Sequence, residues 1–158
     1  MEVASFASFA EIEEEFTARV SRIVWCTVAT VDRQGRPRTR ILHPIWEGST
    51  GWIATGRHSL KEKHLAANPY LSISYWDQEH QQVYVDAKAE WQDDQAEKLR
   101  IWNLYKDAPA PYGYDPAIIW QAGPDDPEYG LLKLTPWRVE LFALKDMITG
   151  AEPKIWKP

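Results

Sequence analysis

The pattern of hydrophobic and polar positions changes near the start of the chain, which separates a predicted helix from a predicted strand. The apolar positions of the first segment have helical spacing: Phe9, Ile12, Phe16 and Val20. Ser8 opens a capping-box sequence with Glu11, so we predict an amphipathic helix over residues 8–21. From Ile23 to Val31 the chain is almost continuously apolar and β-branched, which predicts a strand buried on both faces.

Short apolar or alternating runs separated by turn residues predict five further strands. These runs cover residues 37–46, 52–55, 70–76, 82–91 and 131–144. A turn at residues 32–35 contains Gly35, and Gly48 and Gly51 belong to a second turn at 47–51. The strands are short and follow one another closely, as expected in an antiparallel sheet.

Two more helices are expected between these strands. Ser59 and Glu62 have the spacing of a second capping box, and Asn68-Pro69 ends the helix that follows. A third helix is expected to start at Asp93 or Asp94 and to run to about residue 105. Its predicted buried stripe consists of Leu99, Trp102 and Tyr105. Residues 107–130 are rich in Pro, Gly and Tyr and predict a long ordered loop, with one helical turn after Asp115-Pro116.

Strands with helices inserted between them predict a mainly β (α+β) fold, a closed or partly open barrel with helices at its rim. The length of 158 residues favours one domain over residues 1–158, with the 107–130 loop as an insertion. Nine tryptophans suggest either an extensive interface or a Trp-rich core.

Charge and cysteine content exclude several classes of protein. A net charge of −5 disfavours nucleic-acid binding, since phosphate neutralisation needs a basic surface. The N-terminal sequence is unlike a secretory signal and no apolar run is long enough to span a membrane, so we expect a cytoplasmic protein without a membrane partner. The single Cys26 is expected to be a core residue, and the four histidines show no metal-ligand spacing, so no metal is predicted.

One stretch has the composition of an anion site. Arg38 and Arg40 are two residues apart on a predicted strand and therefore leave the same face. Ser59 and Lys61 lie at the start of a helix, where free backbone N–H groups favour an anion. Antiparallel pairing of strands 37–46 and 52–55 would bring these groups together, which suits a phosphate dianion.

Residues 32–69 resemble the pyridoxamine 5′-phosphate oxidase-related family of FMN-binding split β-barrels. The matching elements, in chain order, are Gly35-Arg36-Pro37, Arg40, Thr55, Ser59-Leu60-Lys61, Leu65 and Asn68-Pro69. Strands 82–91 and 132–142 also fit the family pattern, whereas the 107–130 loop has no clear counterpart.

The resemblance implies a role for particular residues and for a second chain. Arg40 and Lys61 would hold the FMN phosphate, with hydroxyls from Ser59 and Thr55, and the backbone of residues 39–42 would follow the isoalloxazine edge. Gln82 and Phe142 would approach the flavin of a homodimer in which the cofactor lies at the two-fold interface. The implied cofactor-binding set is Arg38, Thr39, Arg40, Ile41, Thr55, Ser59, Lys61 and Gln82.

One departure from the family pattern affects the substrate. True pyridoxamine phosphate oxidases carry an Arg-Leu-His-Asp-Arg-like segment near the C-terminus, and residues 144–148 of this chain read Leu-Lys-Asp-Met-Ile instead. We therefore do not expect oxidation of pyridoxamine phosphate. Four aromatic residues are candidates either for a lid over the flavin or for packing at the dimer flank: Tyr105, Tyr112, Tyr114 and Trp120.

Three functions remain open at this point. The first is an FMN-dependent oxidoreductase, in which no catalytic acid or base can be named. The second is an oxidoreductase of the same fold that uses a deazaflavin with an anionic oligoglutamyl tail, for which Arg57 and Lys63 are candidate cations. The third is a non-catalytic flavin-binding stress or sensor protein.

Overall fold

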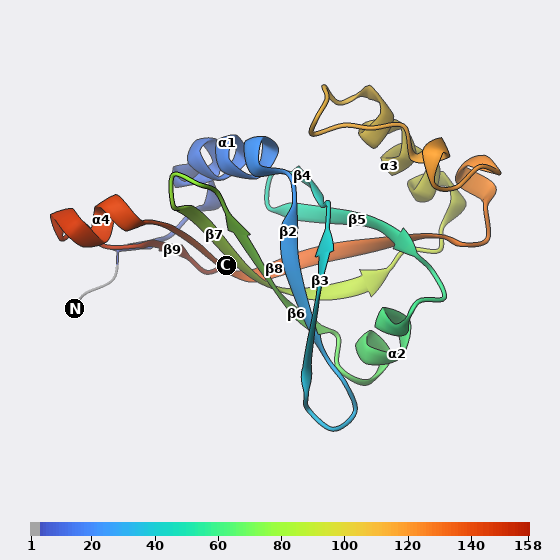
Figure 1. Cartoon of the computed structure of the whole chain (residues 1–158), viewed down its shortest axis with the longest axis horizontal. Helices are drawn as coiled ribbons and strands as arrows, with labels where there is room; N and C mark the ends of the chain where they lie inside the picture. The colour runs from blue at the N-terminus through green and yellow to red at the C-terminus, as the bar shows by residue number, and fades with distance from the viewer. Residues whose placement is uncertain (1–3) are drawn as a thin grey trace.

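The computed structural model describes residues 4–158, and a nine-stranded sheet organises them (Figure 1). Its strands are β1 (Ala4–Phe6), β2 (Cys26–Val31), β3 (Pro37–Leu42), β4 (Ile45–Glu47), β5 (Thr50–Gly56), β6 (Tyr70–Trp76), β7 (Gln81–Trp91), β8 (Tyr129–Ala143) and β9 (Lys154–Trp156). The helices are α1 (Glu13–Ile23), α2 (Leu60–Ala67), α3 (Gln95–Asp107) and α4 (Leu144–Thr149), with 3-10 turns η1 (Phe9–Glu11), η2 (Pro116–Ile118) and η3 (Gly123–Asp125). The predicted mainly β split barrel with helices around it is confirmed.

The strand order explains why the barrel is split. Hydrogen-bonded neighbours follow the path β4-β5-β8-β7-β6-β2-β3, while β9 and β1 extend the far end of β8. The two ends of the path, β3 and β4, are joined directly through His43 and Pro44. Within residues 4–158, β3 pairs only with β2 and β5 pairs only with β4 and β8, so the wall stays open between β3 and β5.

The main core lies inside the curved sheet, with α1 across one end. Phe16 and Val20 of α1 are fully buried and pack against core residues of β6, β7 and β8. Arg19 lies between them and is also buried, and its guanidinium donates to the carbonyl oxygens of Gln82 and Phe142 at 2.9 and 2.8 Å. A buried cation that is hydrogen-bonded in this way fixes α1 to the β7–β8 pair.

Several predicted boundaries need correction. The helix expected to end at residue 21 continues to Ile23, so the strand expected from Ile23 begins at Cys26. That strand alternates between buried and half-buried side chains, because only one face of β2 faces the core. The strand predicted over residues 37–46 is two strands, since Pro44 has no N–H to donate to a ladder.

The third helix is also placed differently in detail. Asp94 is its N-cap and accepts from the Glu97 N–H at 2.9 Å, as one of the two predicted caps. Trp102 and Tyr105 are buried, but Leu99 is 47% exposed and Ile101 occupies the stripe in its place. The predicted helical turn after Asp115-Pro116 is confirmed as η2.

Candidate functional site

The loop between β5 and α2 ends in a hydroxyl that has no hydrogen-bond partner. Ser59 is the N-cap of α2, but its side chain accepts no cap hydrogen bond, so the predicted capping box is wrong. The Ser59 Oγ is buried and has no partner among residues 4–158. Glu62 does not return to Ser59, because its carboxylate accepts from the Arg57 guanidinium at 2.7 Å. An unpartnered hydroxyl and the free N–H groups of the first turn therefore both lie at the start of α2.

Two cations lie beside this helix start without a counter-ion. Burial and the nearby Arg40 lower the pKa of Lys61, and burial and the nearby Arg38 lower the pKa of Arg40. The Arg40 guanidinium donates to the Val28 carbonyl at 3.2 Å, and neither Arg40 nor Lys61 forms an ion pair with any residue from 4 to 158. Like charges held this close are unfavourable, and an anion between them would relieve the repulsion.

The route that brings these cations together differs from the predicted one. Residues 37–42 do not pair with the 50–56 strand but with β2, where Arg40 lies opposite Val28. The approach of Arg40 to Lys61 comes from the curl of the barrel around its split and not from a strand ladder. We call the group Arg40, Thr55, Ser59 and Lys61 the cradle.

Two other charged residues of this loop do not belong to the cradle. Arg57 is engaged by Asp93 at 2.9 Å and by Glu62, and it lies 4.6 Å above the Trp91 ring. It is thus not available as the extra cation suggested for a long anionic ligand. His58 is exposed, with its Nδ1 3.6 Å from Glu62.

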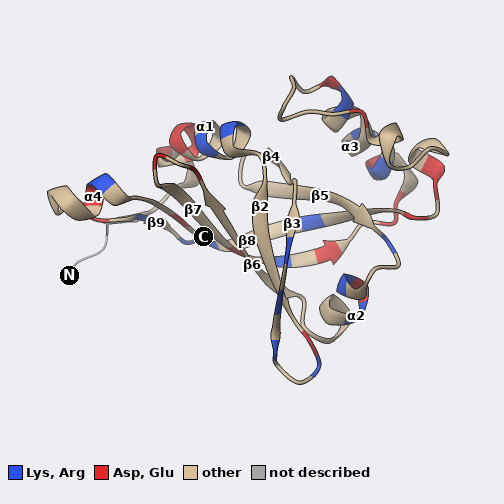
Figure 2. Ribbon diagram, in the orientation of Figure 1, with Lys and Arg blue, Asp and Glu red and all other residues tan. Residues whose placement is uncertain are grey.

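A shallow hollow beside the cradle is rich in basic residues. It measures about 460 Å³ and includes Arg33, Arg38 and Lys63, and none of these three forms an ion pair with a described residue. Lys and Arg positions, drawn in blue, occur along β3, on its hairpin with β2 and on α2 (Figure 2). Arg38 and Thr39 belong to the predicted cofactor-binding set. Both are exposed on β3 and therefore lie at the rim of the site.

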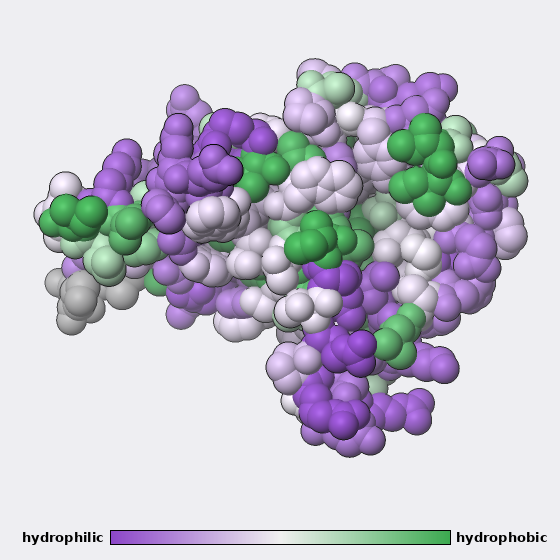
Figure 3. All heavy atoms as spheres, viewed as in Figure 1, coloured by the Kyte–Doolittle hydropathy of each residue, from purple (hydrophilic) through white to green (hydrophobic). Residues whose placement is uncertain are grey.

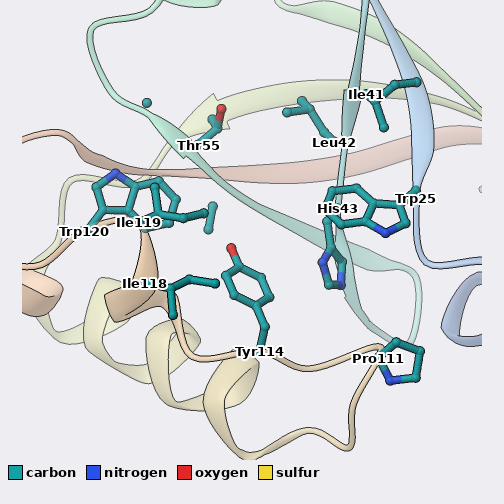
Figure 4. A pocket seen from close by; sticks show the side chains of 12 residues that line it. Trp25, Ile41, Leu42, His43, Thr55, Pro111, Tyr114, Ile118, Ile119 and Trp120 are labelled. Atoms are coloured by element: carbon teal, nitrogen blue, oxygen red, sulfur yellow. The ribbon is translucent and has the colours of Figure 1, made fainter.

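An apolar cavity of about 400 Å³ opens at the split of the barrel, next to the cradle (Figure 4). Its lining comes from the start of β2, from β3, from β5 and from the segment after α3: Trp25, Ile41, Leu42, His43, Ala54, Thr55, Gly56, Pro111, Tyr114, Ile118, Ile119 and Trp120. Thr55 belongs to both the cavity and the cradle. Ile41 and Leu42, which belong to the segment predicted to follow the flavin edge, also line the cavity.

Hydrogen bonds fix the segment 107–130 against the barrel. The buried Tyr105 hydroxyl lies 2.7 Å from the His43 carbonyl and 2.9 Å from the Trp52 carbonyl. The Tyr112 hydroxyl accepts from the Trp46 N–H at 2.7 Å, and the Tyr112 carbonyl accepts from His43 Nε2 at 2.6 Å. Of the four aromatic residues considered for a lid, Tyr105 and Tyr112 therefore anchor the segment.

The other two of these four aromatic residues line the cavity. Trp120 is buried, with its Nε1 donating to the Glu128 carbonyl at 3.1 Å, and Tyr114 extends its ring into the open space. The adjacent Ile118 and Ile119 are 72% and 58% exposed. Figure 3 shows hydrophobic side chains at the surface over this segment and over β3.

Gln82 and Phe142 lie away from this site. They face each other across the β7–β8 pair, and neither lines the cavity. Gln82 accepts a hydrogen bond from the Tyr84 hydroxyl. One protomer thus does not bring Gln82 to the other predicted cofactor residues.

Several lining residues are not among those predicted from the sequence, most notably Trp25, His43, Ile118 and Ile119. The sequence does give one signal at His43, because Pro44 favours an extended backbone at the residue before it. The two isoleucines lie in a Pro- and Gly-rich segment without periodicity, which gave no sign of a wall.

Two negative findings complete the description of the site. No group of His, Cys, Asp or Glu within residues 4–158 has a metal-binding arrangement, and no helix in that range is long and apolar enough to cross a bilayer. Cys26 is a core residue, as predicted, and burial raises the pKa of its thiol to about 12.

Comparison with known proteins now decides the family. The model of the family described as pyridoxamine 5′-phosphate oxidase matches residues 12–143. The chain belongs to this family. The match includes the cradle, the cavity and β8, and it ends before α4.

Curated relatives of the pyridoxamine 5′-phosphate oxidase family match over part of their length. A pyridoxine/pyridoxamine 5′-phosphate oxidase of Paraburkholderia phytofirmans is 41% identical over 64 residues, which are 39% of this chain and 30% of the relative. One of Bacteroides thetaiotaomicron is 33% identical over 81 residues, 49% of this chain and 38% of the relative. The matched stretches thus span about a third of the length of these relatives.

Solved structures share the fold over most of the chain. A Clostridium acetobutylicum protein related to general stress protein 26 has a TM-score of 0.74 at 17% identity and covers 93% of this chain and 94% of its own. An FMN-binding protein of Nostoc punctiforme related to pyridoxamine 5′-phosphate oxidase has a TM-score of 0.63 at 20% identity and covers 87% of each chain. An F420 reductase has a TM-score of 0.56 at 19% identity and covers 77% of this chain and 93% of its own.

Proposed function

We propose that this chain binds FMN in the cradle and serves as a flavin-dependent oxidoreductase that is not a pyridoxamine phosphate oxidase. The observation that carries the proposal is the set of unpartnered groups around the start of α2. Ser59 Oγ is buried without a hydrogen bond, and Arg40 and Lys61 share their surroundings without an acidic partner among the described residues. These are the groups that a phosphate dianion requires.

The chain's own residues would position the cofactor and control access to it. A phosphate held by Lys61, Arg40 and Ser59 would direct the ring toward Ile41 and Leu42, which border the cavity. The bound flavin would supply the redox chemistry, while the protein sets its position and surroundings. The wall formed by residues 111–120 would then limit the access of water and of substrates.

The uncharged lining of the cavity supports the proposal that the substrate is not pyridoxamine phosphate. None of the residues that line the cavity is a lysine or an arginine. Residues 144–149, where the family carries its substrate-binding segment, form α4 at the β9 end of the molecule. A phosphorylated vitamer in this cavity would therefore lack a cation for its phosphate among the residues that line it.

A homodimer is part of the proposal, because one protomer leaves an aromatic sheet face uncovered. Tyr70, Trp76 and Trp137 are 53%, 55% and 48% exposed, and Ile41 on β3 is 60% exposed. Aromatic residues at such density are typical of interfaces. A partner on this face would also give Gln82 a route to the other subunit's flavin. The proposed location of this dimer is the cytoplasm.

A deazaflavin is the second candidate cofactor, and the basic hollow favours it. Arg33, Arg38 and Lys63 lie beside the cradle without ion pairs to described residues, so an anionic tail could continue from the phosphate site. A flavin sensor without turnover is the third candidate. It is supported by the cavity lining, which contains no Lys, Arg, Asp or Glu and in which burial lowers the pKa of His43 and so makes its ring a weaker base.

Titration of the purified protein with three ligands tests the proposal. We expect FMN to bind with submicromolar affinity and riboflavin at least tenfold more weakly, since riboflavin lacks the phosphate but keeps the ring. Tighter binding of F420 than of FMN would instead support the deazaflavin candidate. Equal affinity for FMN and riboflavin would contradict the cradle assignment, and turnover of a reductant by the FMN-loaded protein separates an enzyme from a sensor.

A further inference from the structure

The cavity beside the cradle is uncharged around its whole lining. Its residues include no Lys, Arg, Asp or Glu, although the chain as a whole is 26% charged. Aromatic and aliphatic side chains form two opposed walls, Trp25 and His43 on one side and Ile118, Ile119 and Trp120 on the other (Figure 4). Cavities of this size and polarity bind small organic molecules and not ions.

Two polar groups in the cavity have hydrogen-bonding capacity to spare. The Tyr114 hydroxyl has no partner among residues 4–158 and points into the open space between the two walls (Figure 4). His43 Nε2 donates to the Tyr112 carbonyl at 2.6 Å, so in the neutral ring Nδ1 is an acceptor, and it too has no partner in the described chain.

The protonation states of these two groups at neutral pH are set by burial. Burial lowers the pKa of His43, and the ring therefore stays neutral. Burial raises the pKa of Tyr114 to about 12, and the hydroxyl therefore keeps its proton. The cavity thus offers one donor and one acceptor on otherwise apolar walls.

We propose that the wall formed by residues 111–120 binds an uncharged, planar aromatic compound, with Tyr114 donating a hydrogen bond to it and His43 accepting one. The flat rings of Trp25, His43 and Tyr114 favour a flat ligand, since stacked or edge-to-face contacts need matching faces. This inference rests on the proposed function, because it assigns the compound to the space that the flavin leaves free, and it names the class of substrate.

The cofactor and the compound would not compete for the same contacts. Of the cradle residues only Thr55 also lines the cavity, at its edge. Ser59, Lys61 and Arg40 lie outside it, so the anchored end of the cofactor takes no part of the 111–120 wall. Pro111, Tyr114 and Ile118–Trp120 are thus available to a second ligand.

Calorimetric titration of the FMN-treated full-length protein with naphthalen-2-ol tests the inference. This probe is neutral, planar and redox-inert, and its hydroxyl both donates and accepts. Naphthalene-2-sulfonate is the matched anion with the same rings. We expect the sulfonate to bind at least tenfold more weakly, because the cavity has no cation to pair with it.

Variants of the wall separate a specific site from general hydrophobic binding. Tyr114→Phe is expected to weaken naphthalen-2-ol binding about fivefold, the loss of one neutral hydrogen bond, with unchanged affinity for FMN. Ile119→Asp is expected to weaken it more than tenfold. Ile148→Asp on α4 is the control, since Ile148 is 77% exposed and lies outside the cavity.

Two results would overturn the inference. One is equal binding of the alcohol and the sulfonate, or binding that neither Tyr114→Phe nor Ile119→Asp alters. The other is displacement of bound FMN by naphthalen-2-ol, which would make the cavity the site of the flavin ring itself. A protein that takes up no flavin but binds naphthalen-2-ol with the expected dependence would refute the proposed function and support the assigned ligand class.

Discussion

The cradle and the cavity are neighbours, share Thr55 and differ in almost every physical property. The cradle consists of cations, hydroxyls and helix N–H groups. Its Ser59 Oγ has no hydrogen-bond partner, and its two cations have no acidic partner, in the described chain. The cavity consists of uncharged side chains whose supporting groups are fully hydrogen-bonded, as Tyr105 and Tyr112 illustrate. The cradle is thus incomplete without a ligand, whereas internal hydrogen bonds hold the walls of the cavity in place around an open space.

This difference indicates how binding and selectivity divide between the two regions. Charge-assisted hydrogen bonds would give the cradle a large share of the affinity for any ligand with a phosphate. Apolar walls contribute less per contact but discriminate by shape and charge. We therefore expect changes in the cradle to alter how tightly the cofactor binds, and changes in the cavity to alter which second compound binds.

The largest effect is expected from Lys61→Ala. Loss of a charged hydrogen bond to phosphate costs about 1.5–3 kcal/mol, which corresponds to a roughly 10- to 150-fold weaker affinity for FMN. Riboflavin affinity should stay unchanged, and both are measurable by quenching of flavin fluorescence. Lys63→Ala is the matched control, because Lys63 is exposed two residues further along α2. An unchanged FMN affinity in the Lys61 variant would contradict the proposal that the cradle binds the FMN phosphate.

Gly113→Ala should separate the two regions most cleanly. A Cβ at this position would lie 2.0 Å from the Ala108 carbonyl oxygen, so the backbone of the 107–130 segment would have to move. We expect unfolding to become easier by about 1–3 kcal/mol and binding of naphthalen-2-ol to be lost, while the FMN affinity changes less than about twofold. Ala122→Gly in the same segment is the control. Parallel loss of FMN and naphthalen-2-ol binding would show that the regions are not independent.

Ser59→Ala should affect stability and binding in opposite directions. Removing an unpartnered buried hydroxyl relieves its desolvation, so the flavin-free protein should be as stable as the unmodified one or slightly more so. FMN affinity should fall by a factor of about 2–10, for one lost hydrogen bond. Thermal unfolding with and without FMN measures both. In the control Ser21→Ala, a hydroxyl bonded to the Thr17 carbonyl is lost far from the site. If the flavin-free Ser59 variant melted several degrees below the unmodified protein, the Ser59 hydroxyl would have a stabilising partner, contrary to the structure.

The smallest effect concerns pH and the cavity. Burial holds the pKa of His43 below its usual 6.5, although the Tyr112 carbonyl acts in the other direction. The unfolded chain therefore binds a proton at a higher pH than the folded chain does. The stabilisation from the neutral ring is complete above about pH 6.5 and is lost as the pH falls below it. The melting temperature should fall between pH 7 and 5.5 more for the unmodified protein than for His43→Gln. Identical pH profiles would mean that His43 is more hydrated than the structure indicates.

How much of each region the sequence reveals follows from the range of the interactions involved. The cradle is largely local: Ser59, Lys61 and the stop at Asn68-Pro69 lie within a few residues of one another, and the spacing alone indicates an anion site. The approach of Arg40 was expected for the wrong reason, because strand pairing is a long-range property. The Ser59 capping box failed because Arg57, which the local pattern ignores, holds Glu62.

The cavity is almost entirely long-range. Ile118 and Ile119 show no periodicity, and their position depends on Tyr105 and Tyr112 binding to strands more than 50 residues earlier in the chain. Such contacts leave no mark on local spacing. The aromatic richness of residues 107–130 predicted an ordered segment, but not which of its rings would face the barrel.

The β7–β8 pair has a consequence for how proteins of this kind diversify. Trp91 and Leu132 are paired in register, and the Gln92 N–H donates to the Leu131 carbonyl at 2.8 Å. The chain thus leaves the sheet and returns to it at adjacent points, with α3 and the 107–130 segment in between. A stretch inserted in this way can be exchanged for another without shifting the register of either strand. One recombination event at this point could give the barrel a new cavity wall and leave the Ser59–Lys61 motif untouched.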